Sequence, residues 1–194
     1  MGPGHVRLRK SVVVSGVVVA LLAAACGGGD DGGAPNASNL PKGPKIDVTQ
    51  PCSLLGEAQV AKVLGAPVTV DPTAGGSPIT TDCSYVVGDP AAPVGTLGAN
   101  IVFPALTSLA NAVDVVESDR ANAQIAGSGV ESLEIGKAGF VQRPVSVVEV
   151  AASDDLGFSL QWFPAGGSGG GSPITPAVEK DLSALAADIA QRGR

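Results

Sequence analysis

The residues of this chain best suited to covalent chemistry are its three cysteines, two of which, Cys52 and Cys83, lie well apart from the first. Their spacing matches neither a Cys-x-x-Cys redox motif nor a multi-cysteine zinc site. In an oxidising compartment such a pair forms a structural disulfide. Closing a loop of about 32 residues contributes roughly 3–4 kcal/mol in the chain-entropy model. We therefore expect a Cys52–Cys83 bridge, with a redox-active pair or a metal site as the alternatives.

Cys26 lies in a different setting, at the end of a segment with the features of an export leader. Arg7, Arg9 and Lys10 precede an apolar run of about 14 residues, which suits a signal-peptide core and is too short to span a bilayer. Alanines before the thiol and glycines after it resemble a bacterial lipobox. The pattern predicts a lipoprotein signal peptide over residues 1–25 and cleavage before Cys26. Cys26 would then be acylated, with palmitate among the attached fatty acids. The alternative is an ordinary cleaved leader with an incidental cysteine.

Nucleophilic catalysis lacks its usual partner, because the one histidine, His5, lies in the predicted leader. Residues 166–170 match the Gly-x-Ser-x-Gly pattern of serine hydrolases. Ser168, however, stands in a glycine run, without the strand-to-helix turn and the histidine that such a nucleophile needs. The usual histidine-rich zinc and iron sites are excluded on the same ground. The sequence therefore predicts no catalytic residue, no metal ligand and no cofactor, and a protein that is not an enzyme.

Carboxylates are the remaining candidates for chemistry. A hydrolase of envelope glycans needs two of them, separated by roughly 5–9.5 Å in a cleft, and this is the alternative to a non-enzymatic role. A simpler interpretation is that each acidic cluster lies in a solvated turn or on the solvent-exposed face of a helix. The clusters are Asp30-Asp31, Asp154-Asp155, and the set of Asp114, Glu117 and Asp119.

The net charge argues against nucleic acid as a partner. The formal charge is −6, and loss of the three basic residues of the leader makes it −9. A surface of this charge repels phosphates and anionic lipid headgroups. After the leader, residues 26–50 are rich in Gly, Pro and Asn and predict a flexible tether. Residues 51–194 are long enough for a single extracytoplasmic domain with its own core.

Hydrophobic periodicity predicts the elements of this domain. We expect helices at 57–64, 106–121 and 176–191, and strands at 67–71, 80–87, 96–103, 133–142, 145–152 and 156–163. Turn signals between the strands indicate antiparallel pairing. The predicted fold class is α+β, an antiparallel sheet packed with helices, in the order α-β-β-β-α-β-β-β-α.

Local signals define several helix ends and buried stripes. Gly56 and Gln59 are expected to cap the first helix and Gly65 to end it. Thr175 and Pro176 suit the start of the last helix. The second helix is expected to bury a stripe of four residues at helical spacing, Leu106, Leu109, Val113 and Val116.

The last strand carries two neighbouring aromatic residues, Trp162 and Phe163. Alternation with Ser159 and Gln161 predicts a half-buried strand. We expect Trp162 to belong to the core and Phe163 to lie at an edge, with a ligand pocket lined by both as the alternative. Residues 166–172 are expected to form a glycine-rich loop.

Several short motifs together resemble one protein family. They are Pro-Cys-Ser-Leu-Leu at 51–55, Leu-Gly at 64–65, Cys-Ser-Tyr at 83–85, Ile-Gly-Lys-Ala at 135–138 and an alanine-rich last helix. The chain is similar over roughly 51–190, and in its lipidated leader, to the actinobacterial lipoproteins called domain of unknown function 3558. The first helix departs from that family, with Gly-Glu-Ala-Gln at 56–59 where members usually read Thr-Pro-x-Glu. The resemblance implies an extracytoplasmic, membrane-anchored α+β domain and no established activity.

These observations favour a lipoprotein held at the extracytoplasmic face of the cell membrane through acylated Cys26. Its partners would be the lipid bilayer and a cell-envelope protein or lipid ligand, bound without catalysis. The alternatives are the carboxylate-dependent hydrolase and an extracytoplasmic sensor or inhibitor of a membrane protein.

Overall fold

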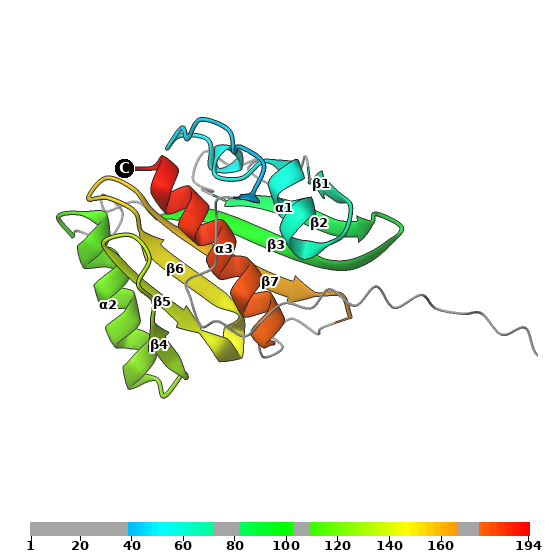
Figure 1. The fold of residues 1–194 in the computed structure, drawn as a ribbon. Helices are drawn as coiled ribbons and strands as arrows, with labels where there is room; N and C mark the ends of the chain where they lie inside the picture. The colour runs from blue at the N-terminus through cyan, green and yellow to red at the C-terminus, as the bar shows by residue number, and fades with distance from the viewer. Residues whose placement is uncertain (1–38, 72–81, 103–108, 167–174) are drawn as a thin grey trace, which may run out of the picture. The chain divides into compact units, whose positions relative to one another are not determined.

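The structure is a computed structural model that describes residues 39–71, 82–102, 109–166 and 175–194 (Figure 1). Its described strands form one seven-stranded sheet in the order β1-β2-β3-β7-β6-β5-β4, with every neighbouring pair antiparallel. The fold class is α+β, as predicted. The elements are η2 (Pro51–Ser53), α1 (Glu57–Leu64), β1 (Val68–Val70), β2 (Asp82–Asp89), β3 (Ala92–Val102), α2 (Ala112–Ile125), β4 (Val130–Ser132), β5 (Ala138–Gln142), η4 (Arg143–Val145), β6 (Val147–Ala151), β7 (Gly157–Pro164) and α3 (Pro176–Arg192).

Helices lie on both faces of the sheet. α1 and α3 cover one face, where Tyr85, Leu97 and Phe158 of the strands pack with Leu182 and Ile189 of α3 in the main core (Figure 1). On the opposite face α2 packs on β5, β6 and the start of β7 and buries a smaller cluster. That cluster consists of Ala112, Val116, Ala138, Phe140 and Ala151.

The predicted helix ends are confirmed. The side chain of Gln59 accepts a hydrogen bond from the backbone N–H of Gly56 at 3.0 Å, and Gly65 ends α1 in the left-handed conformation, with φ 67°. Thr175 accepts a hydrogen bond from the backbone N–H of Val178 at 3.4 Å, with Pro176 in the first turn of α3. These ends are specified locally, by residues within four positions of each other.

Two predicted elements differ from the structure. Of the strand expected at 133–142, only residues 138–142 form a strand, β5, and the short strand β4 lies before the predicted range, at 130–132. Gly136 has φ 70° and turns the chain between them so tightly that a Cβ there would lie 2.3 Å from the carbonyl oxygen of Ala151. The second helix begins at Ala112, where Asn111 caps it by accepting from the N–H of Asp114, and it runs on to Ile125.

The buried face of α2 also differs from the predicted stripe. Ala112, Val115 and Val116 are its fully buried residues, whereas Leu109 and Val113 are only partly buried. Leu106 lies outside the described residues. The later helix start explains the difference, because the stripe was placed on a helix that began six residues too early.

The folded part begins before residue 51. Leu40 and Ile46 pack against the main core, and Arg192 at the end of α3 donates hydrogen bonds to the carbonyl oxygens of Pro44 and Leu54. A Cβ at Gly43 would lie 2.5 Å from the guanidinium carbon of Arg192. Residues 39–50 therefore belong with the domain, which was predicted to begin at residue 51. Residues 26–38 of the predicted tether lie outside the described residues.

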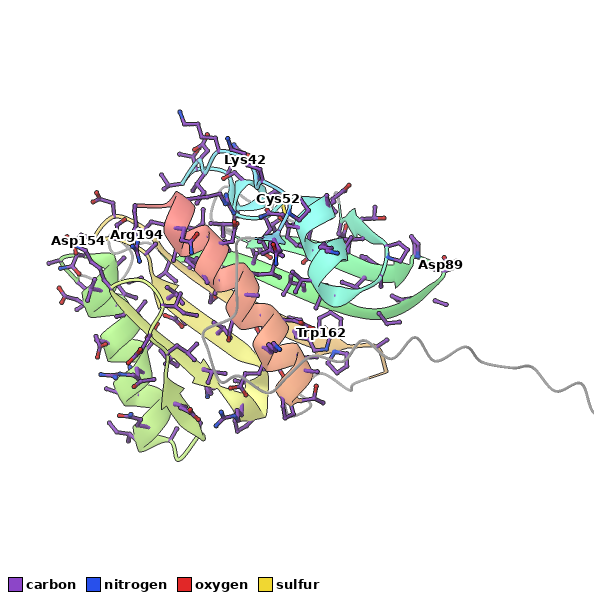
Figure 2. All side chains as sticks on the ribbon, viewed as in Figure 1. Lys42, Cys52, Asp89, Asp154, Trp162 and Arg194 are labelled. Carbon is purple, nitrogen blue, oxygen red and sulfur yellow. A yellow bond between two sulfur atoms is a disulfide. The ribbon has the colours of Figure 1, made fainter. Side chains whose placement is uncertain are left out.

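The predicted disulfide is present. Cys52 of η2 is bonded to Cys83 of β2, which is fully buried (Figure 2). Next to the bridge, the hydroxyl of Tyr85 donates to the carbonyl oxygen of Leu55 at 2.8 Å. Burial raises the pKa of Tyr85 and keeps this hydroxyl protonated as a donor.

Candidate functional site: the polar face of the sheet

One half of the sheet has a polar face that no described helix covers. The main core takes Cys83, Leu97, Ala99 and Leu160 from β2, β3 and β7. Because side chains alternate along a strand, their neighbours point to the opposite side. We call this side the polar face; its members are Asp82, Ser84, Val86, Thr96, Gly98, Asn100, Ser159, Gln161 and Phe163.

Strand pairing aligns four polar residues in a row across the sheet. Asp82 is opposite Asn100, Asn100 is opposite Ser159, and Ser159 is opposite Glu149 of β6. We call these four residues the polar row. Its ends are three strand spacings apart, which is about 14 Å. The row passes from the part of the sheet without a described helix to the part under α2.

Glu149 ends the row as a buried carboxyl group. Its exposed fraction is 8%, and no described donor reaches its Oε1 atom. The pKa of Glu149 is raised to about 8, first by burial, then by the negative charge of Asp119 on α2, and by a hydrogen bond to Asp119 that requires a proton. At neutral pH Glu149 is therefore mostly protonated and Asp119, which is exposed, is its acceptor.

The other residues of the row also have unused hydrogen-bonding capacity. The Oδ1 atom of Asp82 is buried, and no donor among the described residues reaches it. The side chains of Asn100 and Ser159, both partly exposed, make no hydrogen bond with any other residue that the structure describes. Buried polar atoms are normally paired. Asp82, Asn100 and Ser159 are therefore acceptors and donors that a ligand can satisfy, whereas Glu149 is buried beneath α2.

The end of the face beyond the row is apolar. Phe163 is 44% exposed, and its ring lies over Gly98, where a Cβ would be 3.6 Å from Cε2. Val94, 55% exposed, lies at the same end, at the β-bulge of β3 opposite Val87 and Gly88. Two of the large exposed apolar side chains in the described part thus lie together.

Trp162 lies on the opposite side of β7, toward α3, and packs against the main core (Figure 2). It is partly buried, and its ring covers Gly95, where a Cβ would lie 2.4 Å from Cζ2. Trp162 thus packs against the core, as expected, whereas Phe163, expected at an edge or in a loop contact, lies on the face of the central strand β7. Because the rings lie on opposite faces of the strand, they do not line one pocket.

Substitution of Gly95 by Ala should displace this ring. The added methyl group has no room beneath the indole, so Trp162 must move outward. Trp162 is the chain's one tryptophan, so its fluorescence reports this change directly. We expect a red shift of the emission and increased quenching by acrylamide. Gly129→Ala, where a Cβ would lie 4.0 Å from Cδ of Pro144, is the control and should leave the spectrum unchanged.

A separate pocket of about 320 Å³ lies between η4 and the first turns of α3. It is lined by Arg143, Pro176, Glu179, Lys180 and Ser183. Arg143 bonds both oxygens of Glu179, at 2.8 and 2.9 Å, and also pairs with Glu131 at 2.7 Å, and these partners raise its pKa. Through these two ion pairs Arg143 joins α3 to β4 and the β5–β6 turn.

The other predicted site residues have varied positions. Cys26, Ser168 and the Asp30-Asp31 pair lie outside the described residues, as does most of the 166–172 loop. Asp154, in the turn before β7, pairs with Lys137 at 2.7 Å and is exposed, like Asp155. The carboxylate of Asp114 accepts a hydrogen bond from the side-chain amide of Asn111, the residue that caps α2, and Glu117 pairs with Arg120. Of these acids, only Asp119 joins the candidate site.

Sequence reasoning missed the polar row itself. Its one visible signal was Glu149, an acid within the apolar run of β6. Within the described ranges, no group of three or more His, Cys, Asp or Glu residues could hold a metal ion. No helix in those ranges is long and apolar enough to cross a bilayer.

Comparisons of the chain with protein-family profiles, with curated proteins and with solved structures find no match.

Proposed function

We propose that the chain is a lipoprotein anchored through Cys26, related to the domain of unknown function 3558 family, whose domain binds another cell-envelope macromolecule through the polar face without catalysis. The observation that carries the binding role is the polar row. Among the described residues, the Oδ1 atom of Asp82 has no donor, and the side chains of Asn100 and Ser159 have no hydrogen-bond partner. Such groups favour an external partner that supplies the missing hydrogen bonds.

The alternative of a carboxylate hydrolase finds less support. Glu149 and Asp119 are the acids that meet on this face, and they are in hydrogen-bond contact. Glycosidases hold their two carboxyl groups about 5–9.5 Å apart, with a sugar or water between them. Glu149 is also buried beneath α2, where a substrate has no access. This geometry favours recognition over hydrolysis.

The N-terminal segment suggests how the domain would be presented. Residues 40–46 are held beside the C-terminal end of α3 by Arg192. A chain anchored at Cys26 would therefore enter the domain at this end.

Substitution of Cys26 by Ala tests the anchor. Without a thiol there is no acylation, and a single export leader gives no stable attachment once it is cleaved. We expect the protein to move from the membrane fraction to the extracytoplasmic soluble fraction. Ser38→Ala, in the same part of the chain, should leave it in membranes. Retention of the Cys26 variant in the membrane fraction would contradict the lipoprotein assignment.

Photo-crosslinking in intact cells tests the binding surface. We would replace Phe163 by p-benzoylphenylalanine, which preserves the exposed aromatic ring, and use exposed Lys62 of α1 as the control position. A discrete adduct that forms at position 163 and not at position 62 is the expected result. Equal labelling at both positions, or no adduct at position 163, would count against the polar face as the recognition surface.

A further inference from the structure

The pocket between η4 and α3 is a second candidate binding site, on the side of the sheet that α3 covers and opposite the polar face. Its volume of about 320 Å³ lies at the small end of the range for ligand pockets in proteins. Pro176, Lys180 and Ser183 follow one another at helical spacing along one side of α3, and Arg143 closes the pocket from η4. The pocket is therefore large enough for a small molecule and not for a polymer.

Ser183 is the residue that points to a ligand. Its exposed fraction is 6%, yet its hydroxyl group makes no hydrogen bond with any other residue that the structure describes. Buried polar groups in proteins are normally paired. The Oγ atom is not among the enclosed atoms without a partner, so it opens into the pocket that Ser183 lines. A ligand in the pocket would supply the missing hydrogen bond.

The acid of the pocket is already neutralised. Both carboxylate oxygens of Glu179 accept hydrogen bonds from Arg143, at 2.8 and 2.9 Å. Arg143 also pairs with Glu131, which is not part of the lining and whose side chain is 59% exposed, so that water screens its charge. The contacts of Arg143 with the two glutamates use its Nε and Nη2 atoms, and its Nη1 atom is outside them. Glu179 therefore has no acceptor oxygen left for a ligand.

Lys180 leaves the lining with one uncompensated positive charge. It is exposed and makes no ion pair or hydrogen bond with any residue in the described part of the chain. Asp181 follows it in the sequence, but neighbouring residues of a helix do not face each other. Pro176 is in the first turn of α3, so the positive end of the helix dipole adds to the charge of Lys180. The groups of this pocket that lack a partner are thus donors and a cation.

We propose that this pocket binds a small organic molecule through a singly charged oxyanion, a carboxylate or a phosphodiester. The ammonium group of Lys180 balances its charge, the hydroxyl of Ser183 donates a hydrogen bond to one of its oxygens, and the ring of Pro176 packs against its apolar part. A singly charged group is favoured because the lining has one positive charge to balance. A neutral sugar leaves Lys180 unpaired, and an organic cation is repelled by it.

An NMR titration tests the inference on the full chain carrying Cys26→Ala, which keeps it free of lipid. The probes are glucuronate, which carries a carboxylate, and sn-glycero-3-phosphoglycerol, a phosphodiester of the kind found in lipid headgroups. Glucose, which replaces the carboxylate of glucuronate by a neutral CH₂OH group, is the matched control. We expect saturable shifts of the amide signals of residues 177–183 with at least one of the anions and none with glucose. The anion that binds more tightly identifies the source of the ligand.

Matched variants locate the contact. Lys180→Gln and Ser183→Ala should each raise the Kd of the bound anion about tenfold, because a hydrogen bond to a charged group is lost. Lys62→Gln removes the same charge from an exposed position on α1 and should leave the Kd unchanged. Thermal unfolding checks that all three variants are folded. Ser183→Ala should leave the melting temperature unchanged, because the hydroxyl has no partner among the described residues.

Three results would overturn the inference: no saturable shift with either anion, binding of glucose as tight as that of glucuronate, or equal weakening by Lys62→Gln and Lys180→Gln. The last result would show attraction by net charge alone. The proposed function is tested separately, because crosslinking at position 163 reports on the opposite side of the sheet. Failure of one test therefore leaves the other conclusion in place.

Discussion

Replacement of Glu149 by Gln is expected to stabilise the domain at pH 8 and to change its stability little at pH 4. The pKa of Glu149 is about 8 in the folded domain against an ordinary 4.5. Between these values the folded state holds a proton that the unfolded state releases. Stability contributed by this group is therefore complete below about pH 4.5 and is lost as pH rises toward 8, with a slope of up to about 1.4 kcal/mol per pH unit.

The glutamine variant removes this titration. A neutral amide keeps a donor for Asp119 and needs no deprotonation at high pH. Across the whole window the wild type should lose on the order of 5 kcal/mol relative to the variant, since the pKa rises from 4.5 to about 8 and one pKa unit corresponds to about 1.4 kcal/mol. The loss is large because burial, the main cause of the raised pKa, opposes the charged form.

Urea unfolding from pH 4 to pH 9 measures this difference. Glu134→Gln removes an exposed carboxylate and should keep the wild-type pH dependence. Asp119→Asn should reduce the slope only in part, because it removes the neighbouring charge and leaves Glu149 buried. If the unfolding free energies of the Glu149 and Glu134 variants fall equally with rising pH, Glu149 is ionised in the folded domain at neutral pH and does not donate a hydrogen bond to Asp119.

Most elements were predictable because their signals are local. Gly56, Gln59 and Gly65 define both ends of α1, and the alternation of Phe158, Leu160 and Trp162 defines β7. The polar row was not predictable, because it depends on which strands are neighbours. β3 pairs with β7 across more than fifty residues, and this pairing brings Asn100 beside Ser159. One sequence gives no direct information on that register.

The extent of the domain was missed for a related reason. Residues 39–50 have the Gly, Pro and Asn content of a linker. Their order depends on Arg192, which bonds the carbonyl oxygen of Pro44 from the other end of the chain, and on a core surface that accepts Leu40 and Ile46. Composition indicates whether a segment can fold alone. It gives no information on the contacts that the rest of the domain makes with that segment.

Removal of the Cys52–Cys83 bridge is expected to cost about 3 kcal/mol of unfolding free energy, because a loop of roughly this length restricts the unfolded chain by that amount. Cys52→Ala combined with Cys83→Ala should lower the urea midpoint, and reduction of the wild type by dithiothreitol should lower it similarly. Tyr85→Phe, which loses only the hydrogen bond to Leu55, should cost about 1 kcal/mol.

The combination of these variants tests how the N-terminal segment is held. The bridge fixes η2 to β2, and the Tyr85 hydroxyl fixes the adjacent Leu55 to the same strand. If the bridge and the Tyr85 hydrogen bond stabilise the same contact, their effects should be coupled, because neighbouring sites couple. The variant that combines Cys52→Ala, Cys83→Ala and Tyr85→Phe should then lose more stability than the sum of the two separate losses. Hydrogen exchange at Leu54, whose carbonyl receives Arg192, should rise with it. Simple additivity with unchanged exchange would instead show that Arg192 and the packing of Leu40 and Ile46 hold this segment without help from the bridge.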